Sequence, residues 1–235
     1  LWGMEACERG VGVMSSETGW PGRGERGVHA PRWVAGAPGG LPPVRYFDAE
    51  AITGYFGGTL GLRDNAPMVR AWIADSRDRA RAAAADLGLQ GAEVAAYIEA
   101  HPYDVATAQA TLEIEDGLLS EDGTGAMAGF LDKVLPYHKS VADEYGLDLI
   151  MYEGGSHVVG IGPLVEDAAL TSFFTHFNYT PEMGALYQEL LAGWQAQSIL
   201  KQAIGEPERV AAGALGTSEF RRRSGLMMRA ALGRW

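Results

Sequence analysis

The sequence is poor in cysteine and in basic residues, and each shortage excludes a class of structure or partner. Cys7 is the single cysteine, so no internal disulfide can form, and its ordinary role is that of a buried thiol. The formal net charge of −11 argues against nucleic acid as the main partner, because phosphate binding needs clustered Lys and Arg. No run approaches the roughly 18 apolar residues that a membrane span needs, so no membrane association is expected.

Metal-ligand spacings and targeting signals are absent as well. The five histidines form no HxH or HExxH pattern, and the single cysteine excludes CxxC, so neither a metal nor another cofactor is expected. The first residues form neither the basic nor the apolar region of a signal peptide, and the chain begins without an initiator methionine. The sequence therefore leaves the localisation open.

Apolar periodicity predicts strands that alternate with helices. Short apolar runs predict strands near 10–15, 47–54 and 147–152. Helical spacing predicts a helix over 68–87 that Gly88 ends, two shorter helices within 91–119, a helix over 127–145 that Pro136 bends, one around Leu170 to Phe177, and one that opens at Thr180-Pro181. Strands separated by helices need crossover connections, so the fold class is α/β with a parallel sheet.

The two ends of the chain differ in character from its middle. Residues 19–45 are rich in Gly and Pro and predict a long loop. Residues 198–235 carry seven Lys or Arg against three Glu, which gives this segment about +4 and leaves about −15 on the rest of the chain. We therefore divide the sequence into a domain over 1–197 and a basic tail over 198–235.

Two of the predicted strands end in a polar side chain followed by glycines. Glu153 closes the strand at 147–152 and precedes Gly154-Gly155, and Tyr55 closes the preceding strand. Barrel enzymes build their sites at this carboxyl-terminal rim, and glycines allow a sharp turn and a close ligand approach. A glutamate that caps a helix or pairs with Arg, and an ordinary half-buried tyrosine, are the alternatives.

Two histidines receive different interpretations. His157 follows Glu153 by four residues in a predicted loop and is a candidate for contacting substrate. His138 lies on the apolar face of the helix predicted over 127–145, where a core histidine is the expected role. Trp20 and Trp33 flank the long loop and are candidates for stacking on sugar rings, although tryptophan packed beneath a loop is the commoner arrangement.

The LDLIMYEGG segment that ends at Gly155 resembles the nucleophile strand of retaining glycoside hydrolases of the large (β/α)₈-barrel superfamily, which includes cellulases and β-galactosidases. The chain is more closely similar to uncharacterised bacterial cellulase-like proteins, in which TGW, AITGYFGG and YEGGSHVVG follow one another in this order. The similarity covers roughly residues 10–197.

The resemblance implies an incomplete (β/α)₈ TIM barrel made of approximately strands five to seven and their helices, as the carboxyl-terminal part of such a domain. Glu153 is then the nucleophile on strand seven, and Tyr55 on strand six supports it. The family's general acid/base is a Glu that follows Asn on strand four, and no Asn-Glu pair occurs in this sequence. Glu17 is the best local substitute. A truncated gene with a shifted reading frame near residue 198 would explain both ends.

These implications give two functional hypotheses. The first is a retaining glycoside hydrolase that acts on O-glycosyl bonds of a polysaccharide or oligosaccharide and is inactive as this fragment. The second is a non-catalytic carbohydrate-binding protein, or a half barrel that a partner completes with the missing amino-terminal strands. An extracellular or periplasmic location is implied by the resemblance alone.

Overall fold

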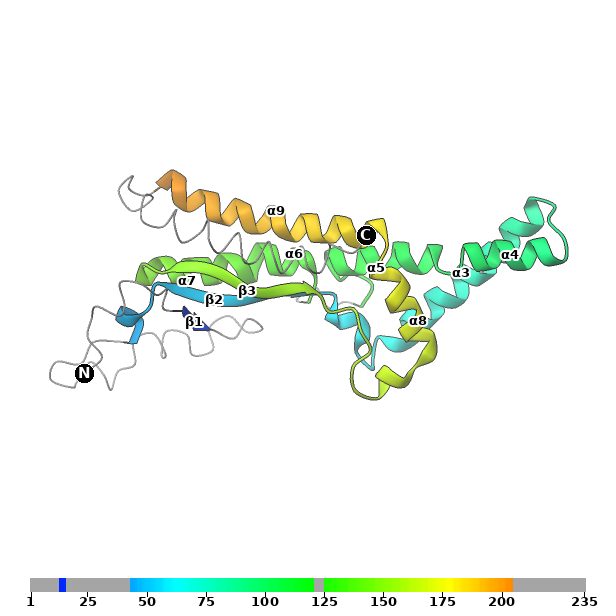
Figure 1. Cartoon of the computed structure of the whole chain (residues 1–235), viewed down its shortest axis with the longest axis horizontal. Coiled ribbons are helices and arrows are strands. Elements are labelled where there is room, and N and C mark those ends of the chain that lie inside the picture. The colour runs from blue at the N-terminus through cyan, green and yellow to red at the C-terminus, as the bar shows by residue number, and fades with distance from the viewer. Residues whose placement is uncertain (1–12, 16–42, 121–124, 205–235) are drawn as a thin grey trace.

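The chain folds as a mixed α/β structure around a small parallel sheet (Figure 1). The computed structural model describes residues 13–15, 43–120 and 125–204. The strands are β1 (Val13–Ser15), β2 (Ala49–Phe56) and β3 (Asp148–Ser156), in the order β1-β2-β3. Both strand pairs are parallel, as the alternation of strands and helices predicts.

The helices follow the predicted segments. They are η2 (Pro43–Tyr46), η3 (Gly58–Gly61), α3 (Ala66–Asp86), α4 (Ala92–Ala100), α5 (Asp104–Asp116), α6 (Met127–Gly129), the π-helical η4 (Phe130–Val134), α7 (Leu135–Tyr145), η5 (Gly162–Glu166), α8 (Ala168–Phe177) and α9 (Pro181–Ile204). Gly88 follows α3 and Gly146 follows α7, both at positive φ, where glycine carries no steric cost. The π turn of η4 ends two residues before Pro136, whose missing N–H interrupts the helical hydrogen bonds.

The helices are distributed unevenly around the sheet. Helix α7 contacts β2 and β3, and α9 contacts β3 and α7. Helices α3 and α4 extend away from the sheet, at the right of Figure 1, and the described residues of α4 include none that is buried. No described helix has both the length and the apolar character needed to cross a bilayer.

The main core lies between one face of β2 and the surrounding helices. Ile52 and Phe56 of β2 are buried there, together with Leu170, Phe173 and Phe177 of α8. These side chains recur at the spacing of one strand face and of one helix face, which is why the sequence pattern predicted the elements. A smaller cluster of Val44, Ala142 and Leu147 closes the other end of the sheet.

Three boundaries differ from the sequence prediction. Strand β3 continues to Ser156 instead of ending at Tyr152, so Glu153 lies within the strand. Strand β2 spans Ala49–Phe56, two residues later at each end than the predicted 47–54. Helix α9 passes the boundary placed at residue 197 and continues to Ile204, and the rest of the predicted tail lies outside the described residues.

Candidate functional site

Tyr55 and Glu153 meet at the carboxyl-terminal end of two adjacent parallel strands. Tyr55 pairs with Gly155, and Thr53 pairs with Glu153, so Tyr55 and Glu153 are diagonal neighbours across the β2–β3 ladder. Their side chains are close enough to interact, because the Glu153 carboxylate contributes to a raised pKa of Tyr55. The predicted placement of both residues at one end of neighbouring strands is therefore confirmed.

This pair lies on the sheet face opposite to α7. Successive side chains of a strand point to opposite faces. Glu50 of β2 contacts His138 of α7, and Ile52 is part of the core, so the even-numbered residues of β2 point toward the helices. Tyr55 therefore points to the other face, where the residue is 46% exposed.

The environment of Tyr55 favours the protonated phenol. Partial desolvation raises the pKa of Tyr55, and the charge of Glu153 and the hydrogen bond to it raise this pKa further. A phenol with its ordinary pKa of about 10 is already protonated at neutral pH, so the Tyr55 hydroxyl can donate to the carboxylate.

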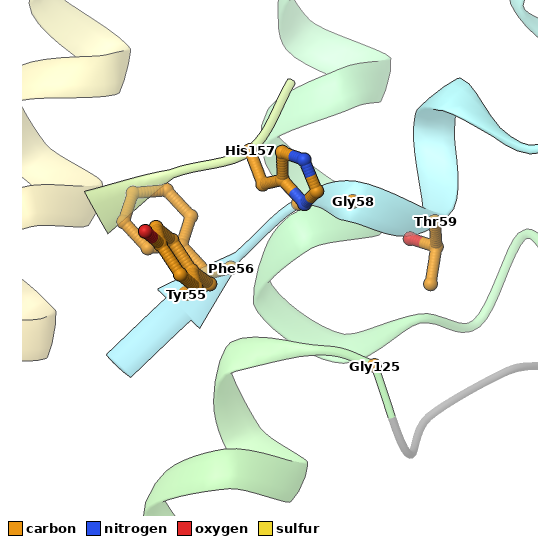
Figure 2. A pocket seen from close by; sticks show the side chains of 7 residues that line it. Tyr55, Phe56, Gly58, Thr59, Gly125 and His157 are labelled. Carbon is orange, nitrogen blue, oxygen red and sulfur yellow. The ribbon is translucent and has the colours of Figure 1, made fainter. Parts of the chain in front are cut away.

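A cavity of about 230 Å³ opens beside Tyr55 (Figure 2). Its described walls come from the end of β2 with η3, from the segment after β3, and from the start of the α6 region: Tyr55, Phe56, Gly57, Gly58, Thr59, His157 and Gly125. The ring centroids of Tyr55 and His157 lie 5.7 Å apart. His157 is exposed and lies in a loop, as predicted, and Glu153 is not among these wall residues.

Asn178, at the end of α8, holds the segment that carries His157. Ser156 Oγ donates to Asn178 Oδ1 at 2.6 Å, and Asn178 Nδ2 donates to the Val158 carbonyl at 3.0 Å. The same nitrogen donates to the Phe174 carbonyl at 2.8 Å, which fixes the amide to its own helix. These bonds tie the loop on both sides of His157 to a rigid helix.

Further contacts fix the same segment from β2 and α9. The His157 N–H donates to the Phe56 carbonyl at 2.8 Å, which continues the ladder past the end of β2. The Ser156 N–H donates to the Tyr187 hydroxyl at 2.9 Å, and the Tyr187 ring packs edge-on against Phe56. The cavity wall is therefore held by side chains from α8 and α9 that lie far from it in the sequence.

The glycines after Glu153 make room for protein side chains, not for a ligand as the sequence suggested. A methyl group on Gly154 would lie 2.7 Å from Met151 Sδ and 2.8 Å from the Gly54 carbonyl oxygen. A methyl group on Gly155 would lie 2.7 Å from the Tyr187 hydroxyl, and Gly155 also has a φ of 127°. The predicted sharp turn is absent at these two residues, because both lie within β3, although the φ of Gly155 is one that glycine adopts at no steric cost.

His138 has the predicted core role. It is fully buried, and its Nδ1 lies 3.1 Å from Glu50 Oε1, which is also fully buried. Trp20, Trp33, Glu17 and Cys7 lie outside the described residues. Among the residues that the structure describes, no group of three or more His, Cys, Asp or Glu has metal-site geometry.

The sequence did not single out Asn178, Tyr187, Thr59 or Gly125. Asn178 has a local signal, because an Asn directly after a helix often bonds backbone carbonyls there. Tyr187 lies in the helix that was predicted to open at Thr180-Pro181, and only the packing shows that its hydroxyl reaches β3. Thr59 and Gly125 carry no signal, since their proximity depends on how distant segments fold together.

Comparisons with known proteins leave the family open. No protein-family model matches the chain, and the searches found neither a curated relative nor a similar solved structure. The functional interpretation therefore depends on the geometry of this site and on the motif resemblance.

Proposed function

We propose that this chain is a retaining glycoside hydrolase with Glu153 as its nucleophile. The observation that carries the proposal is that Tyr55 and Glu153 meet at one end of two adjacent parallel strands, on the face opposite to α7. In a (β/α)₈ barrel the helices cover the outside, and the site lies at the carboxyl-terminal ends of the strands. Strands β1, β2 and β3 then correspond to barrel strands five, six and seven.

The chemistry follows from the two side chains. The Glu153 carboxylate attacks the anomeric carbon, and the bond pair to the glycosidic oxygen leaves with that oxygen. Tyr55 orients the carboxylate before the attack. A water molecule then displaces Glu153 from the anomeric carbon in the second step, which needs a base to remove its proton.

The second carboxylate of a retaining pair has no obvious source in this sequence. No Asn-Glu pair occurs, and Glu17, the substitute that the sequence suggests, lies outside the described residues. Acid/base help contributes roughly 10²–10⁴ in rate, so ordinary glycosides should react very slowly. An aryl glycoside with an acidic phenol needs little protonation of its leaving group, so its aryl group should be released first, with a glycosyl-enzyme left on Glu153.

The test is a panel of dinitrophenyl glycosides with intact-mass analysis of the protein. We expect stoichiometric release of the phenol and a covalent glycosyl adduct that maps to Glu153. Glu153→Gln should abolish both, whereas Glu166→Gln, at an exposed glutamate of η5, should change neither. An adduct or turnover that survives Glu153→Gln would show that Glu153 is not the nucleophile.

The cavity beside Tyr55 favours a second candidate, a non-catalytic carbohydrate-binding site. Its described walls offer aromatic rings, an imidazole and a hydroxyl but no carboxylate, which suits binding of a neutral sugar ring better than its hydrolysis. Calorimetric titration with monosaccharides separates the two hypotheses. Binding that His157→Ala abolishes and Glu153→Gln leaves intact, together with no covalent adduct, supports the binding protein or the partner-completed half barrel.

A further inference from the structure

The β2–β3 ladder contains a one-residue register shift directly before Glu153. Ile52 pairs with Met151, but the next residue of β2, Thr53, pairs with Glu153, so Tyr152 is the extra residue of β3. Such a bulge places two residues of one strand opposite one residue of its neighbour. All pairs beyond it, from Gly54–Gly154 to Phe56–Ser156, follow the shifted register.

The shift decides which face of the sheet Glu153 occupies. In an uninterrupted register Thr53 would pair with Tyr152 and Gly54 with Glu153, and the carboxylate would share the face of Ile52. That face packs against the helices, where an unpaired carboxylate is costly to bury. The bulge instead gives Glu153 the face of Thr53 and Tyr55.

Close packing accompanies the shifted pairs. The Met151 side chain lies against both glycines of the Gly54–Gly154 pair, since its Sδ would be 2.7 Å from a methyl group on either of them. The Gly54 carbonyl oxygen also excludes a side chain at position 154, because it would lie 2.8 Å from a methyl group on Gly154. Both glycines are therefore required for the two strands and Met151 to approach this closely.

We infer that Met151, seated against Gly54 and Gly154, is a positioning residue that holds β3 in the bulged register and so brings Glu153 to Tyr55. The catalytic part of this inference rests on the proposed glycosidase function. The geometric part is independent of it, because the Tyr55–Glu153 contact exists whether or not a glycoside is cleaved. Tyr187 supports the same register from the other end of the bulge through its bond to the Ser156 N–H.

The experiment measures the Tyr55–Glu153 contact by titrating the Tyr55 hydroxyl. Its phenolate absorbance is obtained by subtracting the titration of the Tyr55→Phe variant from that of the otherwise identical chain. In the wild-type chain, Glu153→Gln should lower the pKa of Tyr55, because it removes the carboxylate charge that raises this pKa. In the Gly154→Ala background, Glu153→Gln should leave the Tyr55 titration unchanged, because Glu153 no longer reaches the phenol. This double-mutant cycle reports the coupling between Tyr55 and Glu153, which is the effect of Glu153→Gln on the Tyr55 pKa, and not the overall stability.

Two further variants keep the test decisive. Gly184→Ala in α9 is the matched control, because a methyl group there meets nothing within 4 Å, and the coupling should remain. Met151→Ala removes the seated side chain without adding bulk, so it should weaken the coupling even if Gly154→Ala does not fold. Coupling that persists in every folded variant would overturn the inference.

Activity separates this inference from the proposed function. If both hold, Gly154→Ala slows adduct formation by about 100-fold, the cost of misplacing a reacting group by about 1 Å. If the wild-type chain forms no adduct but the coupling disappears in the Gly154→Ala and Met151→Ala variants, the glycosidase proposal fails and the positioning role stands. If Glu153→Gln does not change the Tyr55 titration in the wild-type chain, the contact itself is absent and the inference is wrong.

Discussion

Asn178 is the side chain whose removal should most weaken the segment around His157. Asn178→Ala removes three hydrogen bonds, to Ser156 Oγ and to the Val158 and Phe174 carbonyls. Each such bond contributes roughly 0.5–1.5 kcal/mol net, and the site is half-buried, so we expect a loss of about 2–3 kcal/mol in the free energy of unfolding. For a chain of this length that corresponds to a fall of about 5–10 °C in the unfolding midpoint.

Urea unfolding and thermal melting of Asn178→Ala measure this loss. Thr175→Ala, at an exposed position of α8, is the control and should stay within about 0.5 kcal/mol of the wild-type chain. Ser156→Ala removes the Ser156–Asn178 bond from the other side, and its effect should overlap with that of Asn178→Ala in a double-mutant cycle. If Asn178→Ala is as mild as Thr175→Ala, the hydrogen bonds do not anchor the loop and the account of the cavity wall is wrong.

Two other contacts give predictions of stability. The Leu170 N–H and the Arg70 guanidinium lower the pKa of Asp167, which accepts at 2.9 Å from Leu170 at the start of α8. This stabilisation is present above pH about 4, the ordinary Asp range, and is lost as the pH falls through the lower folded-state pKa. Asp167→Ala should therefore cost about 1–2 kcal/mol in the free energy of unfolding at pH 7 and progressively less in acid. Urea titrations at pH 7 and in acid measure this difference. Glu50→Ala, which deletes the buried contact with His138, should cost about 2–4 kcal/mol, and Glu50→Gln should cost less because its amide oxygen remains. Equal unfolding midpoints for the two Glu50 variants would contradict a structural role for this contact.

The sequence alone determined the elements and their order. Apolar side chains at strand or helix spacing, together with Gly88 and Gly146, located the main helices and strands to within a few residues, because these signals depend on neighbours in the chain. The rim position of Tyr55 and Glu153 also followed from local information, since parallel strands end at one edge of the sheet. The assignment of His138 to the core followed from its helix face.

Only the tertiary structure decided how these elements produce a site. The face on which Glu153 lies depends on the extra residue Tyr152, and the alternation of the strand sequence gives no sign of a register that changes within a ladder. The contact of Glu50 with His138 joins residues 88 positions apart. Asn178 and Tyr187 reach β3 from two later helices. Such contacts are set by packing between elements, and a periodic pattern records only which side of an element is apolar.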